Sequence, residues 1–497
     1  MKINFYKELE KKWKEICLIH DAMGILEWDK STMMPEGSYE ERTEQLTNLN
    51  VLSHKMTIDK QFYGYIKKSE KLKKLNSWER KNLKLIKKLY IRNNVLDAKL
   101  LRKISKAESS CEMQWRKSKS KSDFKSLIPK LEEVIKLTKI KAKIHSSVFK
   151  CSLYDALLNQ YEDELKSDKI DKIFDQLISF LPNFLKEVLN FQKKNKKIIH
   201  IKDKVKPVFQ ESLGRLLMEK IGFDFSYGRL DVSMHPFCGG AENDARITTR
   251  YNEKNFFESL MGILHETGHA FYNLGLPKKW KYQPVGYPLG TVLHESQSLF
   301  WEMQICRSYE FLKFVSPLIR KNFYVKGKEW EAENLYKIYT CVKPSLIRVN
   351  ADEVTYPLHV IVRYKIEKEL FEGNMKVKEI PKVWNMYMKK YLDIEPKNNE
   401  EGCLQDIHWF DGTFGYFPTY TLGAIYAAQL SVEVKRQIPS LSNEITKGKF
   451  TKLLEWLRHN VHQKGSLYSS DELIKQITGE ELNIDYFKDH LVERYLN

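Results

Sequence analysis

One short stretch, Leu-His-Glu-Thr-Gly-His-Ala at 264–270, constrains this chain more than any other part of it. It holds an H-E-x-x-H motif whose two histidines, His265 and His269, lie four positions apart and therefore share one face of a helix. Two imidazoles so placed can bind one Zn²⁺, and Glu266 between them can act on a water molecule at the metal. Apolar residues at helical spacing surround the motif, so we expect a helix that residues 273–277 close with a glycine and a proline.

A hydrolytic zinc site needs a third protein ligand and one open coordination position for water. Glu295 is the candidate ligand, because it begins a second apolar segment beyond a loop rich in glycine and proline. A helix, a loop and a second helix in this order can bring a carboxylate to an H-E-x-x-H helix. Glu302 on the same segment is the alternative third ligand. The alternative to a metal site is a buried helix that happens to carry two histidines.

The pattern of the whole chain is mainly α-helical. Residues 3–28 carry apolar side chains at helical spacing, and a second helix is expected from residue 38 to about residue 54. Basic amphipathic segments follow to about residue 190, which is typical of long antiparallel helices. Alternating apolar and polar residues with glycines in 228–251 predict one short strand pair, the one small sheet. No linker interrupts the chain, which favours a single domain over 1–497, with a helical part at 1–210 and a catalytic part at 211–497.

The charge balance raises partners other than a small substrate. The formal net charge is +18, with 83 Lys and Arg against 65 Asp and Glu, which would suit nucleic acid or an anionic membrane. The excess lies mostly in lysines of amphipathic helices, and no nucleic-acid recognition motif accompanies it. We therefore interpret the lysine-rich faces as solvated surface and do not expect nucleic acid as a partner.

The cysteines and the N-terminal segment bear on location. Seven cysteines are scattered and none forms a C-x-x-C pair, which indicates reduced thiols and not a disulfide framework. The first residues lack the apolar core of a signal peptide, and no apolar run of 18 or more residues suggests a membrane span. The expected location is cytoplasmic, without membrane association.

Three polar residues precede the H-E-x-x-H motif in the segment of the expected strand pair: His235, Asp244 and Arg246. His235 follows a possible strand and is either a site residue or a histidine that caps a loop. Asp244 and Arg246 are expected to form an ion pair that holds the same loop. We interpret this pair as structural and not as catalytic.

An arginine in an apolar run stands out further along, because Arg348 is followed closely by two carboxylates. The structural interpretation is a buried salt bridge to Asp352, four positions on. The functional interpretation is a guanidinium that binds a substrate carboxylate through two parallel hydrogen bonds.

The segment 402–420 is dense in side chains that bind polar ligands. A tyrosine hydroxyl from this segment can donate to the oxyanion of a tetrahedral intermediate. The alternative for His408 and Trp409 is packing at the start of a helix.

These motifs together resemble the carboxypeptidase Taq family of metallocarboxypeptidases. The resemblance rests on six motifs in the family's order: His-Pro-Phe at 235–237, Asp-x-Arg-x-Thr at 244–248, His-Glu-x-x-His at 265–269, His-Glu-Ser at 294–296, Ile-Arg-x-x-Ala-Asp at 347–352 and Gly-x-x-Gln-Asp-x-His-Trp at 402–409. Segments 27–37 and 415–418 are also similar, so the resemblance covers nearly the full chain. Lys30 departs from the family pattern, where glutamine is more often expected.

The resemblance implies a mostly α-helical fold with a deep active-site groove, and a homodimer. It implies one divalent metal ion per subunit, Zn²⁺ or Co²⁺, held by His265, His269 and Glu295. Glu266 would be the general base, and Arg348 is the candidate for binding the C-terminal carboxylate of a substrate. The remaining candidates for contacts with the substrate or the transition state are His235, His359, His408, Tyr416 and Tyr420.

The expected activity is hydrolysis of the C-terminal peptide bond of peptides, with broad specificity. A metal ion would lower the pKa of a water molecule and polarise the scissile carbonyl, and Glu266 would take the proton and pass it to the leaving amine. A metallo-endopeptidase with the same zinc core is the alternative enzyme. A basic helical binding protein with a vestigial metal site is the alternative from another class.

Overall fold

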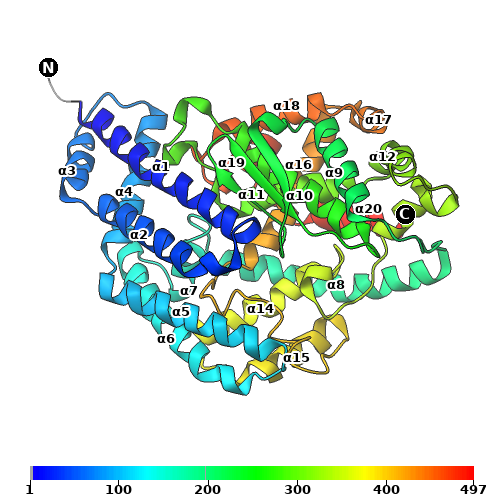
Figure 1. Cartoon of the computed structure of the whole chain (residues 1–497), viewed down its shortest axis with the longest axis horizontal. Coiled ribbons are helices and arrows are strands. Elements are labelled where there is room, and N and C mark those ends of the chain that lie inside the picture. Colours follow the sequence, from blue (N-terminus) through cyan, green and yellow to red (C-terminus); the bar gives the residue numbers. More distant parts are fainter. Residues whose placement is uncertain (1–3, 196) are drawn as a thin grey trace. The chain divides into compact units, whose positions relative to one another are not determined.

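The computed structural model describes residues 4–195 and 197–497 (Figure 1). They form two compact units, each assembled from three stretches of the chain. The first unit contains the described residues of Met1–Asn94, Ile198–Tyr339 and Tyr426–Asn483, and the second those of Val95–Lys197, Thr340–Ile425 and Ile484–Asn497. The predicted mainly α-helical class is confirmed. Single-domain organisation with a division at residue 210 stays a prediction.

The first unit is built mostly from helices: α1 (Phe5–Thr32), α2 (Tyr39–Thr57), α3 (Lys60–Ser69), α4 (Ser77–Asn94), α9 (Pro207–Ile221), α10 (Phe256–Gly275), α11 (Gly290–Leu299), α12 (Tyr309–Asn322), α13 (Ala332–Tyr339), α17 (Leu441–Thr446), α18 (Thr451–Asn460) and α19 (Ser470–Thr478). The two helices predicted near the N-terminus correspond to α1 and α2. Residue 3, where the first was expected to start, lies outside the described residues.

Helix α1 follows the predicted apolar spacing. Leu9, Trp13 and Ile16 form one buried face, which packs against Phe62 of α3 and Ile86 of α4. The side chain of Asn4 caps the helix by accepting a hydrogen bond from a backbone N–H in the first turn.

The sheet lies in the first unit and has three strands among the described residues, β1 (Gly228–Val232), β2 (Phe237–Ala241) and β3 (Asp244–Thr249). Its order is β1-β3-β2, with β1 parallel and β2 antiparallel to β3. The predicted strand pair was therefore one strand short, since β2 contains two consecutive glycines that weaken its strand signal. Helix α10 packs against β3, so the sheet lies beside the H-E-x-x-H helix, as predicted (Figure 1).

The second unit contains the helices α5 (Ala98–Lys119), α6 (Ile128–Phe149), α7 (Leu153–Leu158), α8 (Ser167–Asn195), α14 (Tyr356–Phe371), α15 (Ile380–Leu392) and α20 (Asp485–Leu496). Helix α16 (Pro418–Gln437) carries the chain past residue 425. Among the described helices of both units, none is long and apolar enough to cross a lipid bilayer.

Candidate metal centre and arginine cluster

The structure brings together the three predicted metal ligands. His265 and His269 lie one turn apart on α10, and Glu295 lies on α11. Oε2 of Glu295 is 3.5 Å from Nε2 of His269 and 3.9 Å from Nε2 of His265. In the described part of the chain, these residues form the group of metal-ligating side chains whose donor atoms all lie within 4.8 Å of one another. Tetrahedral zinc with bonds of about 2.0–2.2 Å separates its ligand atoms by roughly 3.4 Å, so the set fits a metal ion.

A glycine allows α11 to approach α10 closely enough for this arrangement. A Cβ atom on Gly268 would lie 2.7 Å from Cα of Ser298 and 2.8 Å from the carbonyl oxygen of Gln297. Both atoms belong to the backbone of α11, so no side-chain rotation can relieve the contact. The glycine inside the H-E-x-x-H motif therefore sets the spacing between the histidines and Glu295.

We expect Gly268→Ala to destabilise the protein by about 1–3 kcal/mol, because the extra methyl group forces the two backbones apart. Metal affinity should fall with stability, since Glu295 moves with α11. Denaturant unfolding and chelator competition measure the two effects. The matched control is Gly262→Ala on the same helix, where a Cβ would meet nothing closer than 3.9 Å. A Gly268→Ala variant with unchanged stability and metal affinity would show that the close approach of the two helices does not determine the ligand geometry.

Glu302, the alternative third ligand, contacts the other side of His265. Its Oε2 is 2.8 Å from Nδ1 of His265, while Nε2 of that ring faces Glu295. Glu302 lies in a π-helical turn, Phe300–Cys306, and its Oε1 accepts a hydrogen bond from Arg307 at 2.6 Å. This geometry favours Glu295 over Glu302 as the third ligand.

His269 is held in place differently. Its ring stacks on the ring of His294, with centroids 4.3 Å apart and planes 14° apart. His294 in turn contacts Oδ1 of Asn273 through Nε2 at 3.1 Å. Within the described residues, Nδ1 of His269 is buried without a hydrogen-bond partner, so stacking is what orients this ring.

Negative charge dominates around the two imidazoles. Burial alone would lower the pKa of His265, but the hydrogen bond to Glu302 and the charge of Glu295 raise it to about 10. Burial raises the pKa of Glu266, and the neighbouring histidines oppose that shift. A site that holds protons this tightly favours a bound cation, and a metal ion that takes the imidazole lone pair replaces the proton.

The predicted loop residues lie beside the sheet. His235 is exposed between β1 and β2, and its carbonyl oxygen accepts a hydrogen bond from the Ser233 hydroxyl. Asp244 and Arg246 form the predicted ion pair, with Nη2 and Oδ2 2.8 Å apart. The guanidinium of Arg246 lies 4.4 Å from the ring centroid of Trp28, so the pair joins β3 to α1.

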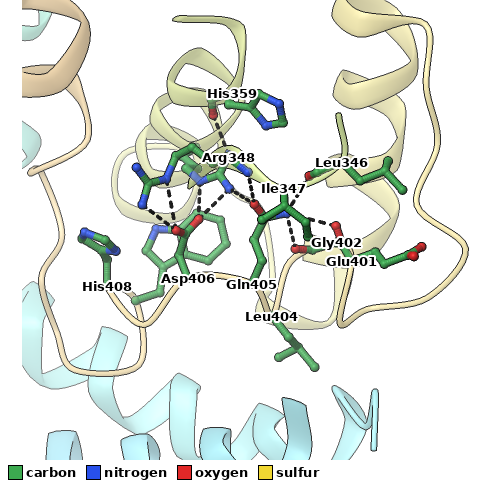
Figure 2. Close-up of polar contacts among 12 residues, drawn as sticks. Leu346, Ile347, Arg348, His359, Glu401, Gly402, Leu404, Gln405, Asp406 and His408 are labelled. Carbon is green, nitrogen blue, oxygen red and sulfur yellow. Dashed lines mark hydrogen bonds and ion pairs between the residues drawn. The ribbon is translucent and has the colours of Figure 1, made fainter. Parts of the chain in front are cut away.

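In the second unit, Arg348 is buried. The structural interpretation, a salt bridge to Asp352, is wrong. Arg348 pairs instead with Asp406, with Nη2 2.8 Å from Oδ1 (Figure 2). Its Nη1 donates to the hydroxyl of Tyr356 at 2.6 Å. The helical turn at Arg348 ends after three residues, so the i, i+4 geometry does not form. Asp352 accepts hydrogen bonds from backbone N–H groups near the start of α14, including that of Thr355.

A second arginine shares the same carboxylate. Nε of Arg363 donates to Oδ2 of Asp406 at 2.6 Å, and Nη2 of Arg363 donates to Oε1 of Gln405 at 2.8 Å. The same Gln405 oxygen accepts from the backbone N–H of Arg348 at 2.8 Å (Figure 2). The two guanidinium groups hold the pKa of Asp406 far below its usual range, although burial opposes them. Gln405 and Asp406 lie in the Gly-x-x-Gln-Asp-x-His-Trp motif at 402–409. This motif was the sequence signal that could have identified both residues. Arg363 had no sequence signal.

The aromatic candidates gather at this cluster, and His359 lies at its margin. The guanidinium of Arg348 lies 5.1 Å from the ring centroid of Tyr420, which contacts Tyr416 edge to face at 5.2 Å. The ring of His408 lies 5.9 Å from that of Tyr416, and burial lowers its pKa to about 4.

His359 is buried on α14. Figure 2 shows its ring outside the network of hydrogen bonds, while its carbonyl accepts from Arg363 at 2.7 Å. Burial and the charge of Arg363 lower the pKa of His359 to about 3, so its ring is neutral at pH 7.

Trp409 is buried, in agreement with the packing interpretation, but it lies in a turn and not at the start of a helix. Its indole Nε1 donates to Oε1 of Glu367 at 2.8 Å, and Oε2 of the same carboxylate accepts from the Tyr154 hydroxyl at 2.6 Å and from the backbone of Gly415 at 2.9 Å. Glu367 is fully buried on α14. Together with the contacts of Gln405 and Asp406 to Arg363 of α14, these bonds anchor the segment to α14 on both sides of His408.

Comparison with known proteins agrees with the fold and the motifs. The family model for carboxypeptidase Taq (M32) metallopeptidases matches residues 8–495. Thermostable carboxypeptidase 1 of Pyrococcus furiosus is 33% identical over 99% of this chain and 98% of that protein. Carboxypeptidase 1 of Bacillus subtilis is 33% identical over 100% and 99%. The solved structure of Trypanosoma cruzi metallocarboxypeptidase 1 has 37% identity and a TM-score of 0.97, and 99% of each chain is covered.

Proposed function

Because this chain belongs to the carboxypeptidase Taq (M32) family of metallopeptidases and is a metal-dependent carboxypeptidase, we propose that it removes single C-terminal residues from peptides of varied sequence. The observation that supports the reaction most is the convergence of two imidazole nitrogens and one carboxylate oxygen, next to a second, buried carboxylate. The proposal names His265, His269 and Glu295 as the holders of one Zn²⁺ or Co²⁺ ion. Imidazole and carboxylate donors suit either ion.

The proposed chemistry divides between the metal and Glu266. A divalent ion at this place supplies a Lewis acid that lowers the pKa of a water molecule and polarises the scissile carbonyl. Glu266 lies between the two histidines in sequence and is 8% exposed, and burial raises its pKa toward the range in which a carboxylate is an effective base. Its carboxylate accepts the proton of the attacking water and then donates it to the nitrogen of the leaving amino acid.

Arg348 is the proposed reader of the substrate's C-terminus. Arg348 and Arg363 share one carboxylate, that of Asp406, so this buried cluster carries one more positive than negative charge. A buried excess positive charge favours an anionic ligand, and the planar guanidinium suits a carboxylate. Two of the five N–H donors of Arg348 remain beyond its hydrogen bonds to Asp406 and Tyr356.

The oxyanion donor is proposed to come from the aromatic group around the arginine. Tyr416 and Tyr420 carry hydroxyls that can donate to a developing negative charge, and His408 contacts the Tyr420 hydroxyl at 3.4 Å. His359 is proposed as a packing residue of this group, because its ring is fully buried and neutral. His235 is proposed to contact substrate from the loop between β1 and β2, where its ring is exposed.

We further propose that the protein is a cytoplasmic homodimer that does not act on nucleic acid. No disulfide joins its seven cysteines among the described residues, which suits a reducing compartment. The proposal of a dimer rests on the family resemblance.

The test is mass spectrometry of one N-blocked peptide incubated with the Zn²⁺- or Co²⁺-loaded protein. We expect a ladder of products that lose single residues from the C-terminus, and a chelator should abolish it. Readdition of the metal should restore it. Internal fragments would instead indicate an endopeptidase, and an intact peptide with both metals would contradict the proposed activity.

A further inference from the structure

We propose that Glu302 and Arg307 are positioning residues that fix the ring of His265 in the orientation needed for metal binding. The inference rests on the proposed ligand set of His265, His269 and Glu295. It adds two residues that are not ligands and that do not touch the substrate.

The two ring nitrogens of His265 face different carboxylates. An ionised carboxylate can only accept hydrogen bonds, so Nδ1, which lies 2.8 Å from Oε2 of Glu302, carries the proton. In the neutral ring, Nε2 is then the nitrogen with the lone pair. Nε2 is also the nitrogen that faces Glu295, at 3.9 Å from its Oε2. Glu302 therefore selects both the tautomer and the ring rotation that a metal ion requires.

Arg307 holds Glu302 in place through two hydrogen bonds. Nη2 of Arg307 donates to Oε1 of Glu302 at 2.6 Å, and the backbone N–H of Arg307 donates to the carbonyl of Glu302 at 3.1 Å. The backbone bond spans five residues, which is the π-helical pattern of Phe300–Cys306. Arg307 thus donates hydrogen bonds to both the backbone and the side chain of Glu302. Each carboxylate oxygen of Glu302 has one partner, Arg307 on one side and His265 on the other.

The rings of the two histidines are oriented by different contacts. His269 has no such partner at Nδ1 among the described residues, and its ring is held by stacking on His294. Among the described residues, the ring of His265 contacts that of His269 nearly at right angles, at 83°, and it has no parallel stacking partner there. Loss of the Glu302 hydrogen bond therefore leaves the orientation of His265 without a substitute. It should affect metal binding more than the loss of any single contact at His269.

The experiment measures the dissociation constant for Zn²⁺ by competition with a chromogenic chelator. Outer hydrogen-bond partners of metal-bound histidines typically contribute 10–100-fold in affinity. We expect Glu302→Gln to weaken Zn²⁺ binding by about 10–100-fold. Arg307→Met should weaken it in the same direction but less, and Arg307→Lys should recover part of the loss. The double variant Glu302→Gln/Arg307→Met should bind no more weakly than Glu302→Gln alone, because both changes act on one contact.

The chain offers a matched control in Glu433 of α16. Its side chain is 9% exposed, against 12% for Glu302, and it pairs with Arg436 at 2.6 Å, the same separation as in the Glu302–Arg307 pair. Glu433→Gln should leave Zn²⁺ affinity unchanged. If Glu302→Gln fails to fold, the two Arg307 variants carry the test with Arg436→Met as their control.

The outcomes separate this inference from the proposed ligand set. Unchanged Zn²⁺ affinity in Glu302→Gln or in Arg307→Met, with His265→Ala strongly weakened, overturns the positioning role and leaves the ligands intact. Unchanged affinity in His265→Ala would overturn the ligand set itself. Complete loss of binding in Glu302→Gln, equal to that of Glu295→Ala, would make Glu302 a ligand and also overturn the inference.

Discussion

Replacing Glu266 with glutamine is expected to lower kcat by about 10²–10⁴-fold while the protein still binds one metal ion per chain. Glutamine has nearly the same shape and keeps the helix, but its amide cannot accept a proton from water. The three proposed ligand side chains are unchanged, so the metal site should persist. Steady-state peptide hydrolysis and metal content of the dialysed variant measure the two effects side by side.

The control for this prediction is Glu433→Gln, the same chemical change at a buried glutamate of comparable exposure on α16. It should hydrolyse peptides at the wild-type rate. A Glu266→Gln variant with wild-type kcat would remove the general-base role. A variant that loses its metal would show instead that Glu266 supports the ligand geometry.

The convergence of the three candidate ligand side chains could be predicted because it depends on local helical geometry. His265 and His269 are neighbours on any helix, and the loop to Glu295 contains the turns that return the chain. The sequence favoured Glu295 over Glu302 through the order of helix, loop and helix, but helical spacing alone did not exclude Glu302. Residues seven apart lie two helical turns, or about 10 Å, apart on the same face, so both carboxylates face α10. The π-helical turn and the hydrogen bond from Arg307 position the Glu302 carboxylate at Nδ1 of His265.

The arginine cluster shows the limit of spacing arguments more clearly. Asp352 lies four positions from Arg348 and satisfied the helical rule, yet the partner is Asp406, 58 positions away. The rule assumes a continuous helix, and here the helical turn ends at Asn350. Arg363 joins the same carboxylate from α14, which no sequence pattern announced. The third strand of the sheet was missed for a similar reason, since β2 forms through pairing with β3 and not through its own propensity.

The dependence of binding on the substrate's C-terminal carboxylate is expected to disappear when Arg348 is replaced by methionine. Truncating one partner of a buried, hydrogen-bonded charge pair costs about 2–5 kcal/mol, which corresponds to roughly 30- to 4,000-fold in affinity. The inactive Glu266→Gln protein provides the background, because it can bind an N-blocked peptide without cleaving it. We expect that background to bind the free acid at least about 30-fold more tightly than the C-terminal amide.

Calorimetry of four combinations measures the interaction directly: free acid and amide, each with Glu266→Gln and with Glu266→Gln/Arg348→Met. Adding Arg348→Met should lower the affinity for the free acid to that for the amide. The affinity for the amide should stay nearly unchanged, which is the signature of a pairwise contact. Arg348→Lys should fall between, since an ammonium keeps the charge and loses the planar fork. Asp406 keeps Arg363 as a partner in these variants, so the cluster retains an ion pair. Equal weakening of the acid and the amide would mean that Arg348 acts through the structure of the cluster and does not read the C-terminus.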